Sequence, residues 1–65
     1  MSLDIQPGMY IRTLAYFGYN EPLLVLRSYA TIANGYMVWH LTWLDAQGKI
    51  QSASHYESDL EIVVL

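Results

Sequence analysis

The stretch that decides the fold runs from Leu23 to Leu44 and reads LLVLRSYATIANGYMVWHLTWL. Two runs rich in β-branched and aromatic residues flank Asn34-Gly35, a dipeptide that tolerates the two positive-φ positions of a type I′ turn. The sequence therefore predicts an antiparallel hairpin in which Ala33 faces Tyr36. Because the side-chain period of a strand is two residues, this register assigns every side chain of the hairpin to one of two faces.

One face of the predicted hairpin is apolar and is expected to be buried. Apart from Ser28, it carries Leu24, Leu26, Ala30, Ile32, Met37, Trp39, Leu41 and Trp43. The other face is mixed and is expected to be partly solvated. It carries Arg27, Tyr29 and Thr31 opposite Val38, His40 and Thr42. One apolar face and one mixed face are typical of an antiparallel sheet that is covered on one side.

The segments before the hairpin predict one further strand. Pro7-Gly8 marks a turn, and residues 9–16 alternate loosely between two faces. Residues 17–22 hold Gly, Asn and Pro, which indicates a loop.

The segments after the hairpin predict two more strands, and the register of the first is open. A four-residue loop at Asp45–Gly48 would place Ile50 beside Trp43, whereas a three-residue loop would place Gln51 there. The hydrophobic pattern favours the four-residue loop. A short turn is expected at residues 56–59, followed by a last strand over residues 60–65.

These elements predict an all-β fold. The chain has 65 residues, which is enough for a single domain, and no segment of ten or more residues shows helical periodicity with capping signals. Five short strands must curl to cover their apolar face. We therefore expect residues 1–65 to form one small five-stranded antiparallel β-barrel, in which residues 1–6 can be flexible.

Composition and charge disfavour several classes of function. The chain has no cysteine, which excludes disulfides and thiolate zinc sites. Three basic residues stand against six acidic ones, for a net charge of −3, so nucleic-acid binding is disfavoured. No stretch approaches the roughly 20 apolar residues of a membrane helix and no leader is visible, so we expect a cytoplasmic protein without a membrane partner.

Four motifs together resemble small SH3-like barrels of the KOW, Tudor and small bacterial barrel type. They are Pro7–Arg12, the central hairpin, Trp43–Lys49 and Ser58–Glu61. The resemblance spans most of the chain, rests on commonplace residues and implies an SH3-like fold. The chain departs from the nucleic-acid-binding members because it lacks their basic loops. It also lacks a clean copy of the aromatic signature of peptide-binding SH3 domains, although residues 14–19 echo it loosely.

The aromatic residues are the strongest candidates for a binding surface. Tyrosine and tryptophan are enriched at protein interfaces because they supply rigid contact area. The candidate binding residues are Tyr16, Phe17, Tyr19, Tyr29, Tyr36 and His40. They predict a non-catalytic module for protein binding or assembly, with a protein partner or a second copy as ligand. The alternative is a nucleic-acid-binding SH3-like barrel.

No catalytic residue, metal ligand or cofactor is predicted. The four-residue loop would place His40 and His55 on one face, but no third ligand converges on them. Glu57, Asp59 and Glu61 are read as solvated charges near a strand edge. The glycines are scattered singly and no nucleophile elbow is present, so the sequence does not indicate an enzyme.

Overall fold

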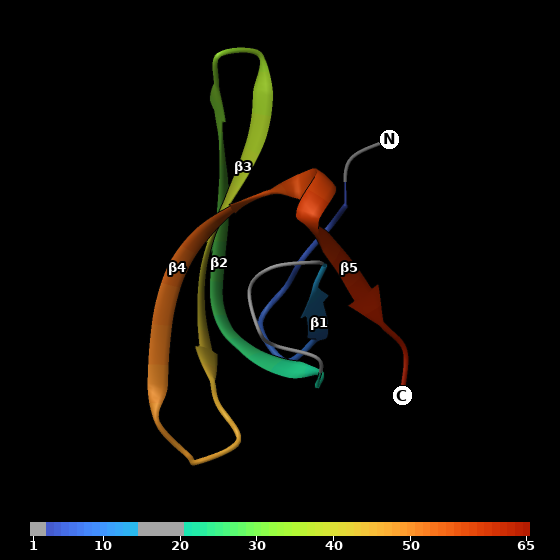
Figure 1. Ribbon diagram of the computed structural model, residues 1–65, viewed down its shortest axis with the longest axis vertical. Helices are drawn as coiled ribbons and strands as arrows, with labels where there is room; N and C mark the ends of the chain where they lie inside the picture. Colours follow the sequence, from blue (N-terminus) through green and yellow to red (C-terminus); the bar gives the residue numbers. More distant parts are fainter. Residues whose placement is uncertain (1–2, 15–20) are drawn as a thin grey trace.

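The computed structural model describes residues 3–14 and 21–65, which form one antiparallel sheet (Figure 1). Its strands are β1 (Tyr10–Thr13), β2 (Leu23–Ala33), β3 (Tyr36–Leu44), β4 (Ile50–Tyr56) and β5 (Leu60–Val63), in the order β4-β3-β2-β1-β5. One 3-10 turn, η2 (Glu57–Asp59), connects β4 to β5. The prediction of an all-β fold with five antiparallel strands is confirmed. The two edge strands, β4 and β5, do not pair with each other, so the described part of the sheet is not closed.

The hairpin between β2 and β3 forms in the predicted register from its turn as far as the pair Arg27 and Thr42. Asn34 and Gly35 have φ angles of 52° and 81°, as a type I′ turn requires, and Ala33 pairs with Tyr36. Farther from the turn, Tyr29 pairs with His40. The hairpin tip extends beyond the rest of the sheet (Figure 1).

A β-bulge overturns the predicted burial of β2. The pairing with β3 shifts between Val25 and Arg27, so Leu26 is the extra residue and the faces of β2 exchange at this point. Leu23 and Val25 are therefore buried, whereas Leu24 and Leu26 are only half-buried. At the other end of β2, Ile32 lies on the predicted face but is 72% exposed, because this part of the hairpin projects past the core.

The core fills the space between β2, β3 and β4 on one side and the N-terminal segment, β1 and β5 on the other. Trp39, Leu41 and Trp43 are buried, as predicted. The remaining apolar core residues are Ile5, Ile11, Leu23, Val25 and Leu60.

The segment before β1 packs against the sheet. Ile5 is 1% exposed, and its carbonyl oxygen accepts a 2.6 Å hydrogen bond from Ser28 Oγ. The N–H of Gly8 donates to the Val25 carbonyl, and the N–H of Val25 donates to the Met9 carbonyl. The N-terminal segment thus lies along the edge of β2 where the bulge begins.

The predicted register between β3 and β4 is wrong. Gln51 lies opposite Trp43, and Ile50 lies opposite Leu44 with 68% of its surface exposed. The turn explains the difference. Asp45 Oδ1 accepts hydrogen bonds from the N–H groups of Gln47 and Lys49, and these bonds decide the register against the hydrophobic pattern.

The electrostatics of this turn follow from the same contacts. The hydrogen bond from the backbone of Lys49 is the main cause that lowers the pKa of the Asp45 carboxyl. A second contribution comes from Gln51, whose Nε2 donates to Asp45 Oδ2. The carboxylate is thereby held in its charged form as a cap for the turn.

Strands β1 and β5 join the two ends of the fold. Tyr10 pairs with Val63 and Thr13 with Leu60, so the last strand ends two residues earlier than predicted. An exposed ion pair of 3.1 Å links Arg12 Nε to Glu61 Oε1. Within the described ranges, the structure contains no helix with the length and apolar character needed to cross a membrane.

Candidate functional site

The candidate site is the face of β2, β3 and β4 that points away from the core, which we call the outer face. Strand alternation places on it Arg27, Tyr29, Thr31, Tyr36, Val38, His40, Thr42, Ile50, Ser52, Ser54 and Tyr56. Most of these side chains are exposed, and the others are half-buried. The outer face therefore coincides with the mixed face predicted for the hairpin, extended by β4.

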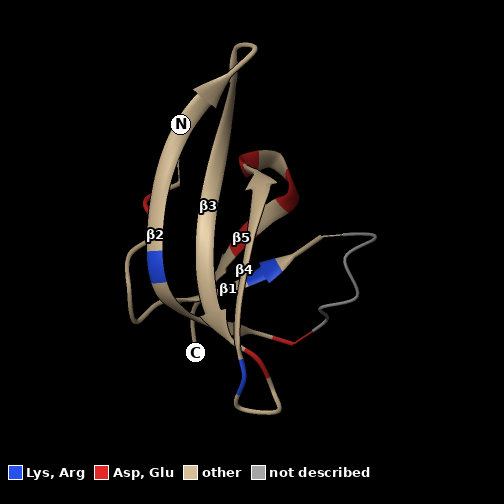
Figure 2. Cartoon of the chain, turned by 90° about the vertical axis from the view of Figure 1, so that its left-hand side faces the viewer, with Lys and Arg blue, Asp and Glu red and all other residues tan. Residues whose placement is uncertain are grey.

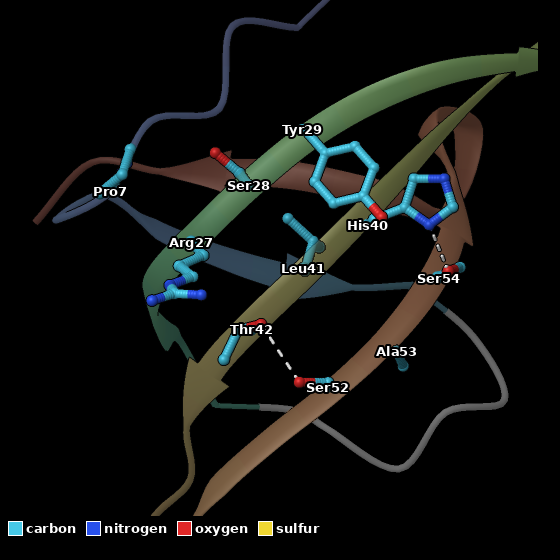
Figure 3. A pocket seen from close by; sticks show the side chains of 10 residues that line it. All are labelled: Pro7, Arg27, Ser28, Tyr29, His40, Leu41, Thr42, Ser52, Ala53 and Ser54. Atoms are coloured by element: carbon cyan, nitrogen blue, oxygen red, sulfur yellow. Dashed lines mark hydrogen bonds between the residues drawn. The ribbon is translucent and has the colours of Figure 1, made fainter.

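At its centre, Tyr29 stacks on His40. The two rings have centroids 4.5 Å apart and an interplanar angle of 15°, and the residues are directly opposite in the β2–β3 pairing. Tyr29 is nevertheless 63% exposed, because only one side of its ring is covered by the imidazole (Figure 3). The other side of the ring faces solvent.

Two hydroxyl groups hold the imidazole of His40 in place. Thr31 Oγ1 lies 2.8 Å from Nε2, and Ser54 Oγ lies 2.8 Å from Nδ1. In a neutral imidazole one nitrogen donates and the other accepts, and a hydroxyl can take either role. Three neighbouring strands thus contribute to one network, which fixes the ring that Tyr29 stacks on.

The Ser54–His40 contact has the length of a nucleophile–base hydrogen bond. In a Ser-His-acid triad, a carboxylate orients the histidine through its second nitrogen. Here the second nitrogen meets the hydroxyl of Thr31 instead. The geometry therefore positions the His40 ring, and it supplies no carboxylate to stabilise an imidazolium.

An open groove of about 650 Å³ lies beside the stacked pair (Figure 3). Its lining consists of Pro7, Arg27, Ser28, Tyr29, His40, Leu41, Thr42, Ser52, Ala53 and Ser54. Among the described lining residues, Arg27 alone carries a formal charge, and most of the other polar side chains are hydroxyls. Figure 2 shows acidic residues in η2, in β5, in turns and in the N-terminal segment, and none of the groove's described lining residues is acidic. The formal charge that the described lining residues bring to the groove is therefore positive, in a chain with a net charge of −3.

A second aromatic pair lies nearer the hairpin tip. Tyr36 and Tyr56 meet edge to face, with centroids 5.9 Å apart and an interplanar angle of 72°. Val38, which lies opposite Tyr56, separates this pair from the Tyr29–His40 stack on the outer face. Tyr56 was missed by the sequence prediction because it was assigned to a turn. Tyr56 alternates with Ser52 and Ser54, and the observed β3–β4 register, not the predicted one, places all three on this face.

His55 lies on the opposite side of the sheet from His40, which corrects the prediction that they share a face. It pairs with Trp39 in the β3–β4 register and is buried near the Trp43 ring, at a centroid distance of 6.2 Å. Burial lowers the pKa of the His55 imidazole, and the charge of Asp59 opposes part of that shift. The two histidines therefore cannot ligate one metal ion in this fold.

The three carboxylates Glu57, Asp59 and Glu61 do not converge. Glu57 Oε1 accepts hydrogen bonds from the Leu3 N–H, at 2.6 Å, and from Trp39 Nε1, at 3.0 Å. Glu61 pairs with Arg12 instead. Across the described residues, no group of three or more His, Asp or Glu side chains is placed to hold a metal ion.

Of the six predicted binding residues, the structure places Tyr29, Tyr36 and His40 on the outer face. Tyr29 and His40 are in contact, whereas Tyr36 contacts Tyr56. The remaining three, Tyr16, Phe17 and Tyr19, lie outside the described residues. Comparison of the chain with protein-family models, with curated proteins and with solved structures found no match.

Proposed function

We propose that this protein is a non-catalytic binding module that docks a protein partner on the outer face of β2, β3 and β4. The observation that carries the proposal is the Tyr29–His40 stack, in which an exposed aromatic ring is held rigid by a hydrogen-bonded neighbour. A ring that is already ordered loses little entropy when a partner covers it. Such rings are the usual anchors of protein interfaces.

The composition of the outer face supports the same conclusion. Its centre and tip are aromatic or apolar, and hydroxyl groups surround the groove. Charged groups are depleted in the buried centre of interfaces, as they are here apart from Arg27. The guanidinium at the rim favours a partner segment that places a carboxylate beside an apolar side chain.

An SH3-like relationship and a cytoplasmic setting belong to this proposal. The five antiparallel strands, the short turn η2 and the entry through Asp59-Leu60 into β5 fit the SH3-like pattern. Barrels of this kind commonly act as interaction modules, and this analogy concerns the fold alone.

The test is affinity capture from a lysate of the cells that make the protein. Wild type is compared with the double variant Tyr29→Ala/His40→Ala and with Val64→Ala, which removes apolar surface far from the outer face. We expect a stoichiometric protein to be retained by wild type and by Val64→Ala and to be lost from the double variant. The thermal midpoint of the double variant should stay close to that of wild type, because Tyr29 is mostly exposed.

Two results would contradict the proposal. A large loss of thermal stability in the double variant would assign these residues to the stability of the sheet. A catch that disappears after nuclease treatment would favour the nucleic-acid alternative, in which binding weakens steeply as salt is raised.

A further inference from the structure

Strand β4 forms one edge of the sheet that the structure describes. It is the last strand on its side of the sheet, and no strand in residues 3–14 or 21–65 pairs with its outward-facing backbone. Ser52, Ala53 and Ser54 at its middle are all exposed, which includes Ala53 on the inner side of the sheet. A row of unpaired N–H and C=O groups is a template for another strand.

The sequence of β4 lacks the residues that usually prevent strand pairing. Natural edge strands carry charges, proline or bulges, and β4 contains none of them over its seven residues. The other edge differs, because β5 carries the charged residue Glu61 within the strand. The two edges of the described sheet are therefore unequal, and β4 is the one without a charge inside the strand.

The sequence of β4 is complementary to itself. In an antiparallel pair centred on Ala53, Ile50 lies opposite Tyr56 of the second copy, and Ser52 lies opposite Ser54. Ile50 and Tyr56 are both exposed on the outer face, so each would cover apolar surface of the other. Aliphatic–aromatic and hydroxyl–hydroxyl cross-strand pairs are both stabilising.

Charge at the ends of the strand selects the same register. Lys49 precedes β4 and Glu57 follows it. Antiparallel pairing about Ala53 brings Lys49 of one copy beside Glu57 of the other at both ends. Since a two-fold interface repeats every contact, the Lys49–Glu57 charge pair forms at both ends of the paired strands.

We propose that β4 pairs with β4 of a second copy of this chain, across a two-fold axis at Ala53, to form one continuous ten-stranded sheet. Opposite residues of an antiparallel pair point to the same side. The outer faces of the two copies would therefore lie on one side of the dimer, and each groove would acquire a neighbour. A single strand pair is smaller than the standard interface of about 1,600 Å², so the association is weak.

The chain lacks cysteine, so one introduced thiol reports the register directly. Ala53→Cys would place two thiols opposite each other at the axis, within the Cα separation that a disulfide needs. Ala46→Cys, in the exposed turn before β4, is the matched control. Under mild oxidation we expect Ala53→Cys to cross-link at least about tenfold faster, because pairing raises the effective thiol concentration to the millimolar range. Equal rates for the two variants would overturn the proposal.

Sedimentation equilibrium of the full chain gives a second readout. Wild type should approach twice its monomer mass as its concentration rises, and Ala53→Glu should weaken the association by about tenfold or more, because it places two carboxylates together at the axis. Lys49→Gln, which removes the charge that faces Glu57 in the proposed register and adds no carboxylate beside Asp45, should weaken it as well. A wild-type chain that stays monomeric up to millimolar concentration contradicts the proposal.

The same measurements separate this inference from the proposed function. Self-pairing uses an edge and needs no other partner, so Tyr29→Ala/His40→Ala should dimerise as wild type does. A double variant that no longer dimerises would instead assign self-association to the outer face.

Discussion

Glu57 connects three separate parts of the molecule through one carboxylate oxygen. Its Oε1 accepts from the indole N–H of Trp39, which is a core residue of β3, and from the backbone N–H of Leu3 in the N-terminal segment. The residue itself begins η2. Both donors are partly buried, so loss of the carboxylate leaves them without this acceptor.

Glu57→Ala is expected to lower the free energy of unfolding by about 1 to 3 kcal/mol, the range for removing a charged partner from partly buried donors. The matched control is Glu61→Ala, which deletes a carboxylate whose ion pair with Arg12 is exposed and should cost less than about 1 kcal/mol. Urea unfolding followed by tryptophan fluorescence measures both. Equal losses for the two variants would show that the Glu57 hydrogen bonds add no stability.

His55 gives the fold a defined dependence on pH. Its pKa is lowered in the folded protein, mainly by burial, from an ordinary value of 6.5. The unfolded chain therefore binds this proton more readily, and stability falls as the pH drops below the ordinary value towards the lowered one. Urea midpoints should decrease from about pH 7.5 to about pH 5.5, a window above the range in which carboxylates titrate.

The control for this effect uses the other histidine. His55→Gln should flatten the pH dependence in that window, whereas His40→Gln should keep it. A slope that persists in His55→Gln would assign the pH dependence to another group.

Single residues could be predicted from the sequence where their pattern was strong. Trp39, Leu41 and Trp43 alternate beside a defined turn, and all three are buried. Ile5 was not predicted, because Leu3 and Ile5 alternate with polar residues over too few positions to define a strand, and the burial of Ile5 depends on contacts with distant β2. Likewise, the hydrogen-bond partners of His40 are Thr31 and Ser54. The contact with Ser54 could be predicted only from the correct β3–β4 register.

At the scale of elements, the β2–β3 hairpin depends on the conformation of its turn. Gly35 has a φ angle of 81°, and a Cβ added there would meet nothing within 4 Å. Substitution therefore costs only backbone strain, and no steric clash is introduced. We expect Gly35→Ala to lower the free energy of unfolding by about 1 to 2 kcal/mol, the cost of a left-handed conformation for a residue with a Cβ.

Gly35→Asn is the control for this prediction, because asparagine adopts the left-handed region more readily than alanine does. The decrease in the free energy of unfolding, measured with urea, should be clearly smaller for Gly35→Asn than for Gly35→Ala. If the two variants lose the same stability, the conformation of the turn is not what the glycine supplies.

The two turns explain why one register was predicted and the other was not. Asn34-Gly35 has a narrow conformational preference, and it sets the pairing without help from the strands. The β3–β4 turn depends on three hydrogen bonds to the Asp45 side chain, and hydrophobic alternation alone led to the wrong face for Ile50. The bulge at Leu26 escaped prediction for a related reason, because it depends on the N-terminal segment that pairs with Val25.

For the molecule as a whole, the all-β fold class could be predicted from the number of strands and their periodicity. Whether the sheet closes into a barrel could not. Whether five strands curl into a barrel or leave two edges depends on how β4 and β5 approach each other, and no local pattern encodes that distance. The candidate site was predictable in part for the same reason. The hairpin contributions to the outer face were foreseen, and those of β4 required the three-dimensional pairing.

The pairing of β1 with β5 has a consequence for how the chain folds. Strands β2, β3 and β4 follow one another through short turns, so their contacts form between sequence neighbours. Tyr10 and Val63 instead close a loop that spans most of the chain. Because closing a long loop costs more entropy, we expect the β1–β5 pairing to form more slowly than the pairings within β2, β3 and β4. Until it forms, hydrophobic side chains of these three strands remain exposed to solvent. The rate of unfolding therefore depends on the pairing of β1 with β5, in which a few residue pairs close a long loop.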